Sequence, residues 1–249
     1  MHVYIYDSFL NQKKYDRILA RLETRITDLG LNGKISRLGT ITNIHDIVDH
    51  EIKHGAKTII AVGNDQTVNQ VLNVTAGRNV PLGIIPIEEK NNDIALSLGI
   101  LDMESACNVL SARRITLLDL GVANNTFFLS SVAIEATGTI VEVSKDYSIE
   151  IQKRGQIIVK NLSNIDENLS KHGKFNPQDG VLELLINTDN KNFYNSTKKN
   201  ISVFPVKNIS ISNNKQGLIV DGLIKIKTPT EISVLKQKLK IIVGRERNF

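Results

Sequence analysis

The sequence predicts an N-terminal α/β domain built on a parallel sheet, followed by an antiparallel β-sandwich domain. In the first part of the chain, apolar runs alternate with segments whose apolar residues recur at helical spacing. This is typical of a parallel sheet covered by helices on both faces. From about Leu117 onward, apolar and polar residues alternate in short runs between Asn, Gly, Lys and Asp, which favours antiparallel strands. We therefore expect the domains to span residues 1–116 and 117–249.

The N-terminal half is expected to alternate strand and helix. Its buried strands are the apolar runs at residues 3–6, 58–62 and 82–87. After the first strand, apolar residues recur at helical spacing until Gly30, which is a typical helix terminator. Asn43 can cap the next helix, and Gly55 can end it. A third helix is expected directly after the strand at residues 58–62.

The C-terminal half is expected to consist of strands. The candidate strands are residues 117–122, 126–136, 147–152, 156–162, 181–186, 201–212, 218–227 and 232–243. We expect Lys153, Arg154 and Gly155 to turn a hairpin between two of them. A cleft between the two halves is the default place for a ligand.

Composition limits the partners that the chain is expected to have. There are 31 Lys and Arg residues against 26 Asp and Glu residues, a net charge of +5, which favours phosphate-bearing partners or an anionic membrane surface. Aromatic residues make up 5% of the chain, too few for the stacking platforms of a nucleic-acid-binding protein. A single cysteine and the absence of a secretory start predict a cytoplasmic protein, soluble or peripheral to the inner face of the membrane.

The most informative stretch is the strand-to-helix turn at residues 59–73, where an apolar strand breaks at Gly63 and a helix restarts around Asp65. The first turn of a helix leaves backbone N–H groups without intrahelical partners, beside the positive end of the helix dipole. A phosphate or a metal is therefore expected here. The alternative is an ordinary turn in which Asp65 only caps the following helix.

A second motif is His50-Glu51-Ile52-Lys53-His54, which matches the H-E-x-x-H pattern of zinc hydrolases. On a helix, His50 and His54 would share one face, as two zinc ligands require, with Glu51 as the base. The apolar stripe of this helix leaves both histidines toward solvent, and no third ligand follows. We therefore keep zinc chemistry as a remote alternative to a solvated helix end.

The order of motifs resembles the diacylglycerol kinase catalytic-domain family, which includes bacterial lipid kinases and is distantly related to NAD kinases. Members carry Gly-Gly-Asp-Gly-Thr after a strand, and residues 63–67 read Gly-Asn-Asp-Gln-Thr. Their Gly-Thr-Gly-Asn-Asp-Phe-Ala loop corresponds to residues 88–95, which read Glu-Glu-Lys-Asn-Asn-Asp-Ile-Ala. Further matches at residues 119–121 and 177–183 extend the resemblance over nearly the whole chain.

The resemblance implies phosphoryl transfer from ATP to a lipid hydroxyl with the help of Mg²⁺, so the partners are a nucleotide and a lipid. It implies that Asp65 organises metal and phosphate. It places Asp179 and Glu183 in a segment that holds a structural metal. The residues that it assigns to the nucleotide are Gly63, Asn64, Gln66, Thr67, Asn92 and Asp93.

Three departures from the family pattern bear on activity. Gln66 replaces a glycine, and the Glu88–Glu89 pair stands where the second loop has glycines. Leu223 replaces the glutamate that serves as the family's proposed base, so Asp221 or Asp65 would have to take the proton. Two hypotheses follow: a lipid kinase, or a catalytically impaired homologue that binds a nucleotide, a lipid or a protein.

A late cluster of lysines suggests a contact with anionic lipid headgroups. Strand geometry would place several of these lysines on one face, which a membrane or only solvent could cover. A homodimer stays open as a further alternative. The lysines are Lys225, Lys227, Lys236, Lys238 and Lys240.

Overall fold

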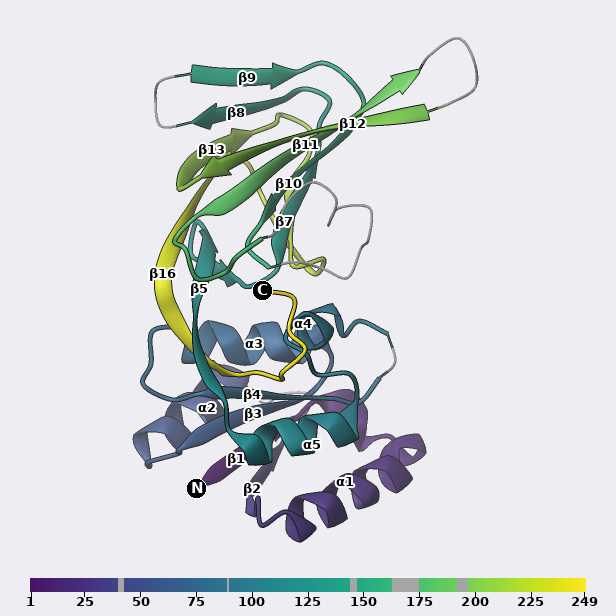
Figure 1. Cartoon of the computed structure of the whole chain (residues 1–249), viewed down its shortest axis with the longest axis vertical. Coiled ribbons are helices and arrows are strands. Elements are labelled where there is room, and N and C mark those ends of the chain that lie inside the picture. The colour runs from purple at the N-terminus through teal and green to yellow at the C-terminus, as the bar shows by residue number, and fades with distance from the viewer. Residues whose placement is uncertain (40–42, 89, 144–146, 163–174, 192–196) are drawn as a thin grey trace. The chain divides into compact units, whose positions relative to one another are not determined.

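The chain forms two compact units in the computed structural model (Figure 1). Unit 1 comprises Met1–Leu118 and Lys238–Asn248, and unit 2 comprises Asp119–Gln237 with Phe249. The structure describes residues 1–39, 43–88, 90–143, 147–162, 175–191 and 197–249.

Unit 1 contains a parallel sheet whose strands follow the order β2-β1-β3-β4. Every residue of β3 and β4 is buried, which explains their uninterrupted apolar sequences. β2 was not expected, because it is an edge strand whose residues are mostly exposed and polar. The strands are β1 (His2–Tyr6), β2 (Gly33–Arg37), β3 (Thr58–Gly63) and β4 (Leu82–Pro86).

Helices cover this sheet on both faces, as expected. α3 lies on one side of β3 and β4, and α5 lies on the other side (Figure 1). α1 contacts α5, and α2 contacts α3. The helices are α1 (Asp16–Asp28), α2 (Ile44–Lys53), α3 (Asp65–Thr75), α4 (Asp93–Ser97) and α5 (Met103–Ala112), with 3₁₀ turns η1 (Ser8–Asn11) and η2 (Lys13–Tyr15). In the described part of the chain, no helix is both long enough and apolar enough to cross a bilayer.

The last strand, β16 (Thr230–Ile242), contributes to both units. Its early residues pair with β13 in unit 2, whereas Ile241 pairs with Leu82 of β4 in unit 1. The segment Lys238–Asn248 therefore packs with the N-terminal unit, although the sequence pattern assigned it to the β domain. The sequence could not reveal this, because β16 has the same kind of strand pattern in its unit 2 part and in its unit 1 part.

Unit 2 is a sandwich of antiparallel strands, which confirms the expected fold class. One sheet has the order β12-β11-β10-β7-β14-β15. In the second, β13 pairs with both β8 and β16, and β8 pairs with β9. Buried apolar residues of both sheets form one core. The strands are β5 (Ile115–Ala123), β6 (Thr126–Phe128), β7 (Ser131–Glu135), β8 (Thr139–Val143), β9 (Tyr147–Ile151), β10 (Gly155–Lys160), β11 (Leu182–Lys191), β12 (Thr197–Val206), β13 (Asn208–Ser212), β14 (Leu218–Val220) and β15 (Ile224–Ile226).

The hairpin expected at residues 153–155 is wrong. β9 pairs with β8, whereas β10 pairs with β7 and β11. Residues 153–155 therefore connect strands of two different sheets and do not join two hydrogen-bonded neighbours. The reason is that β8, which the sequence analysis did not single out, takes the place beside β9.

Candidate functional site

The turn after β3 is closed by its own side chains. Asn64 Oδ1 accepts hydrogen bonds from the backbone N–H of Gln66 at 3.0 Å and of Thr67 at 3.4 Å. In return, the Asn64 N–H donates to Thr67 Oγ1 at 3.2 Å, which completes a capping box. The Asp65 N–H donates to the Asn91 carbonyl at 2.8 Å. The amides that would receive a phosphate therefore already have acceptors within the chain.

Two further features lock this turn. A Cβ at Gly63 would lie 2.2 Å from Thr67 Oγ1, so only glycine fits there. The Thr67 hydroxyl donates to Asp7 Oδ2 at 2.6 Å, and Asp7 Oδ1 accepts from the Phe9 N–H at 3.2 Å. Sequence reasoning missed Asp7, although an acid directly after the apolar strand β1 was a usable signal.

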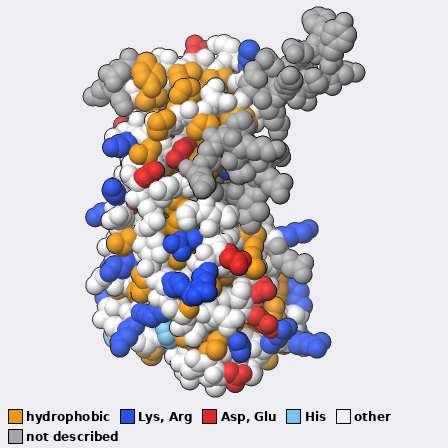
Figure 2. Space-filling model, in the orientation of Figure 1, with side chains coloured by type: hydrophobic (Ala, Val, Ile, Leu, Met, Phe, Trp, Pro, Cys, Tyr) orange, Lys and Arg blue, Asp and Glu red, His pale blue; other side chains and the backbone are white. Residues whose placement is uncertain are grey.

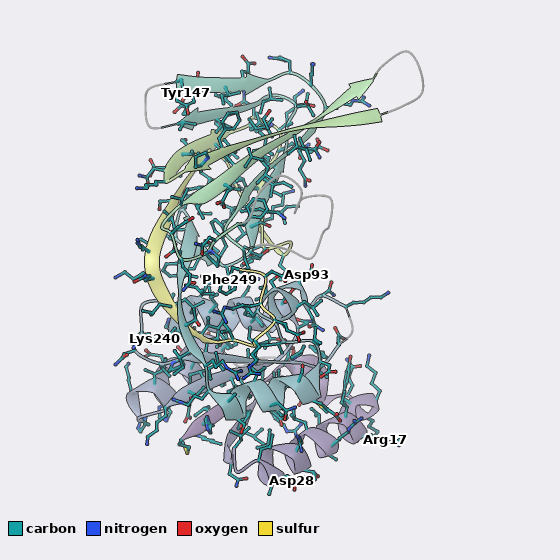
Figure 3. The ribbon with its side chains drawn as sticks, in the orientation of Figure 1. Arg17, Asp28, Asp93, Tyr147, Lys240 and Phe249 are labelled. Carbon is teal, nitrogen blue, oxygen red and sulfur yellow. The ribbon has the colours of Figure 1, made fainter. Side chains whose placement is uncertain are left out.

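Asp65 joins the turn to the second family loop. Its carboxylate is buried and accepts hydrogen bonds from the N–H groups of Asp93 at 2.9 Å and Ile94 at 3.3 Å. Asp93 is the first residue of α4 (Figure 3). Two residues expected at the site from separate loops, Asp65 and Asp93, are thus brought together. The carboxylate caps a helix that begins 28 residues later in the chain.

Glu88 places a carboxylate beside the same turn. Tyr15 donates its hydroxyl to Glu88 Oε1 at 2.7 Å, and Asn64 Nδ2 donates to Glu88 Oε2 at 3.4 Å. The Asn92 side-chain amide donates to the Glu88 carbonyl, so Asn92 serves the loop itself. A negative charge here would repel the phosphates of a nucleotide. Glu89, the second member of the expected acidic pair, lies outside the described residues.

Asp221 is engaged in unit 2. Its carboxylate accepts hydrogen bonds from the N–H groups of Leu129 at 3.1 Å, Ser130 at 2.9 Å and Ser131 at 2.7 Å. Desolvation raises the pKa of Asp221 to about 6, although the three amides act in the opposite direction. Leu223, two residues later, is exposed and carries no proton acceptor. The arrangement gives Asp221 the geometry of a structural acid that holds the turn before β7.

Asp179 and Glu183 form a pair of neighbouring carboxylates in unit 2. Burial and the nearby Asp179 carboxylate raise the pKa of Glu183 to about 7. Glu183 Oε2 is buried and makes no hydrogen bond, whereas Asp179 Oδ1 accepts from the Val181 N–H at 3.0 Å. A buried acceptor without a donor suits a cation. However, no group of three or more His, Cys, Asp or Glu side chains is placed to hold a metal within the residues that the structure describes.

The H-E-x-x-H motif does not assemble as a zinc site. Its rings do share a face of α2, with centroids 4.0 Å apart for His50 and His54. Glu51, however, is buried and its Oε1 pairs with Lys34 Nζ at 2.5 Å. His54 Nδ1 lies 2.8 Å from the His50 carbonyl oxygen. The supposed base is therefore committed to an ion pair inside unit 1.

Asp119 is a buried acid that was not singled out as a site residue. Its Oδ2 accepts a hydrogen bond from the Gly180 N–H at 2.6 Å, and its own N–H donates to the Pro177 carbonyl at 2.7 Å. It thereby fixes the turn that carries Asp179. An acid within the apolar residues of β5 was the available signal.

Comparisons with known proteins find similarity to diacylglycerol kinases. Residues 3–123 match the family model of the diacylglycerol kinase catalytic domain. A diacylglycerol kinase structure from Bacillus anthracis strain Sterne superposes with a TM-score of 0.75 at 18% identity, covering 98% of this chain and 97% of that one. A second structure from the same strain, described as a candidate diacylglycerol kinase, gives 0.73 and 16% with the same coverage. At such identities these structures establish the fold alone. No curated protein matches the sequence.

Proposed function

Because residues 3–123 carry a diacylglycerol kinase catalytic domain, we propose that this lipid kinase-like chain is a homologue with impaired phosphoryl transfer that still binds lipid. The observation that carries the proposal is the capping box of Asn64 and Thr67. A glycine at position 64 would leave the amides of α3 free for phosphate oxygens, whereas Asn64 takes two of them itself.

ATP does not fit this turn as it is folded. A phosphate would have to displace the Asn64 side chain and approach the Glu88 carboxylate, which Tyr15 holds in place. In an active relative, ATP supplies the phosphoryl group and Mg²⁺ neutralises its charge. In this chain, the residues available to hold Mg²⁺ beside a nucleotide are Asp65 and Asp93, and Asp65 is already engaged by two amides.

The acceptor side of the reaction also lacks a proton acceptor. Leu223 occupies the position of the family's base, and Asp221 is held by three backbone N–H groups. Loss of a positioned general base lowers a rate by roughly 10²- to 10⁴-fold. A slow enzyme is therefore the most that these residues support.

A second candidate function is ATP-dependent phosphorylation of a lipid hydroxyl. The observation that favours it is the Asp65–Asp93 contact, which brings together two residues that the family uses. This candidate requires Asn64 to swing out of the capping box when a nucleotide arrives.

The Asp179–Glu183 pair supports a further part of the proposal, a structural cation in unit 2. The unpartnered Glu183 Oε2 and the neighbouring Asp179 carboxylate would both be stabilised by a divalent ion. Main-chain oxygens or water would complete its coordination, since hard cations accept such ligands.

The test is calorimetric titration with Mg-ATP, followed by transfer assays with diacylglycerol, sphingoid and polyprenol acceptors. We expect no saturable ATP heat and at most slow product formation from the natural chain. The triple variant Asn64→Gly, Gln66→Gly and Leu223→Glu should gain turnover. In the matched control, Leu223→Gln replaces Leu223→Glu, because glutamine has a similar size but cannot take the proton. Robust turnover by the unmodified protein would establish the second candidate instead.

A further inference from the structure

The β14–β15 hairpin of unit 2 exposes an unusual set of apolar side chains. β15 is the edge strand of its sheet, and Ile219 of β14 stands opposite Lys225 of β15. Leu218 and Val220 are buried in the core, which anchors the hairpin. In contrast, Ile219 is 46% exposed, Leu223 is 44% exposed and Ile224 is 38% exposed. The turn end of the hairpin is therefore apolar and in contact with solvent.

Lysines lie beside these apolar side chains and toward the open end of the same hairpin. A cavity of about 450 Å³ there is lined by Lys215, Lys225 and Lys227 together with uncharged residues, and no acid contributes to its lining. Between residues 213 and 228 the only acid is Asp221, whose carboxylate is held by three amides. Glu135 of β7 accepts a hydrogen bond from Gln216 Nε2 at 3.5 Å. The accessible charge of the hairpin is thus positive.

The geometry points to the β14–β15 hairpin as a docking element for an anionic lipid bilayer. Strand residues advance by about 3.3 Å, so Lys227 lies about 10 Å along the strand from Ile224. That separation matches the depth of about 5–10 Å to which interfacial segments bury their apolar side chains. Ile219, Leu223 and Ile224 then enter the acyl boundary and Lys227 meets the lipid phosphates. Lys225, the strand partner of Ile219, extends its long side chain back toward them. This inference rests on the proposed lipid-binding function and names the surface that serves it.

Charge distinguishes this hairpin from another exposed apolar region of unit 2. Hydrophobic side chains also gather over β8 and β9 (Figure 2), where Ile140 and Tyr147 are exposed. Glu142 and Glu150 are exposed on the same two strands. Anionic lipid would be repelled there, whereas it complements the lysines of the hairpin. Lys238 and Lys240 belong to unit 1.

Co-sedimentation of the full chain with vesicles tests the inference without ATP. We expect binding to vesicles of phosphatidylcholine mixed with phosphatidylglycerol, weak binding to phosphatidylcholine alone, and release by salt. Each lysine near an anionic surface is worth about fivefold in affinity, so Lys225→Gln with Lys227→Gln should weaken binding about 25-fold. Ile219→Asn should weaken it independently of salt, because it removes the inserted side chain.

Two substitutions elsewhere in unit 2 serve as matched controls. Lys207→Gln removes an exposed lysine and Tyr147→Asn removes an exposed apolar ring, both away from the hairpin (Figure 3 labels Tyr147). Unchanged vesicle binding by both controls, with loss in the hairpin variants, supports the inference. Equal loss in a control, or full binding by the Lys225→Gln, Lys227→Gln variant, overturns it. Kinase turnover is not part of this readout, so an active enzyme would refute the proposed impairment and leave this result standing.

Discussion

The backbone N–H of Gln237 donates a hydrogen bond of 2.7 Å to Asp119 Oδ1. Gln237 has a φ of 53°, a left-handed conformation that is unusual for a residue with a side chain. It is the last residue of unit 2 on β16, and Asp119 is the first residue of unit 2 on β5. The same carboxylate accepts from Gly180 at 2.6 Å. One buried acid therefore stabilises the left-handed residue Gln237 of β16 and the turn that carries Asp179.

Replacing this acid tests its role. Asp119→Asn keeps the shape but leaves one of the two amides facing an NH₂ group. An unsatisfied buried donor costs about 1–3 kcal/mol, so we expect the free energy of unfolding to fall by about 2 kcal/mol. Urea denaturation measures the loss. Glu150→Gln, an exposed acid in the same unit, is the control and should shift the midpoint little. Equal stabilities of the two variants would contradict the assignment.

Stability should fall as pH rises, because of Glu183. Its pKa in the folded protein is about 7, above the ordinary value of 4.5, so the folded state binds the proton more tightly. The stabilisation is complete below the ordinary pKa and is lost as pH rises through about 7. The pKa of Asp221 is also raised, to about 6, so its protonation likewise makes stability fall as pH rises to about that value. The loss of stability between pH 6 and pH 7 should therefore disappear in the Glu183→Gln variant. Midpoints of urea denaturation across this range measure it. The same dependence of the midpoint on pH in both proteins would refute the role of Glu183.

A divalent cation should reverse this pH dependence. An ion at Asp179 and Glu183 requires the ionised carboxylates, so the rise in melting temperature with added Mg²⁺ or Ca²⁺ should be larger above pH 7 than at pH 6. Glu183→Gln should abolish the rise, whereas Glu150→Gln should retain it. If neither Mg²⁺ nor Ca²⁺ changes the melting temperature of the natural chain, the proposed structural metal is refuted.

Gly63 and Thr67 should behave as a coupled pair. The Cβ of Gly63→Ala would overlap Thr67 Oγ1 at 2.2 Å, and overpacking of this kind costs about 1–3 kcal/mol. Thr67→Ala removes that oxygen along with its bond to Asp7. The double variant should therefore be more stable than the sum of the single effects, by at least about 0.5 kcal/mol. Additive losses in a double-mutant cycle would show that the two groups do not compete for the space.

Much of the fold could be predicted from the sequence because strands that are buried on both faces have uninterrupted apolar sequences. β3 and β4 are buried throughout and read as uninterrupted apolar runs. β2 could not be predicted in this way, since its edge position allows polar side chains. The pairing of β16 with β4 could not be predicted either, because the sequence of a strand does not determine which strand it pairs with.

The site residues were predictable as positions but not as partners. Asp65 and Asp93 could each be picked out from a loop, and the structure joins them. The engagement of Asp221 depends on residues about ninety positions earlier, which no local pattern reveals. The family resemblance assigns Asn64 to the nucleotide, yet in the structure its side-chain oxygen accepts hydrogen bonds from the first turn of α3. Local sequence gives the conformational options of a residue, while tertiary contacts select among them.

The return of residues 238–248 to unit 1 has a consequence for biosynthesis. Ile241 pairs with Leu82, the Val243 N–H donates to the Arg114 carbonyl at 2.9 Å, and the Asn248 N–H donates to the Ser97 carbonyl at 3.1 Å. Until these late residues leave the ribosome, β4 presents an open edge with unpaired peptide groups to other nascent chains. Unit 1 can therefore be completed only after residues 119–237 of unit 2 have been translated.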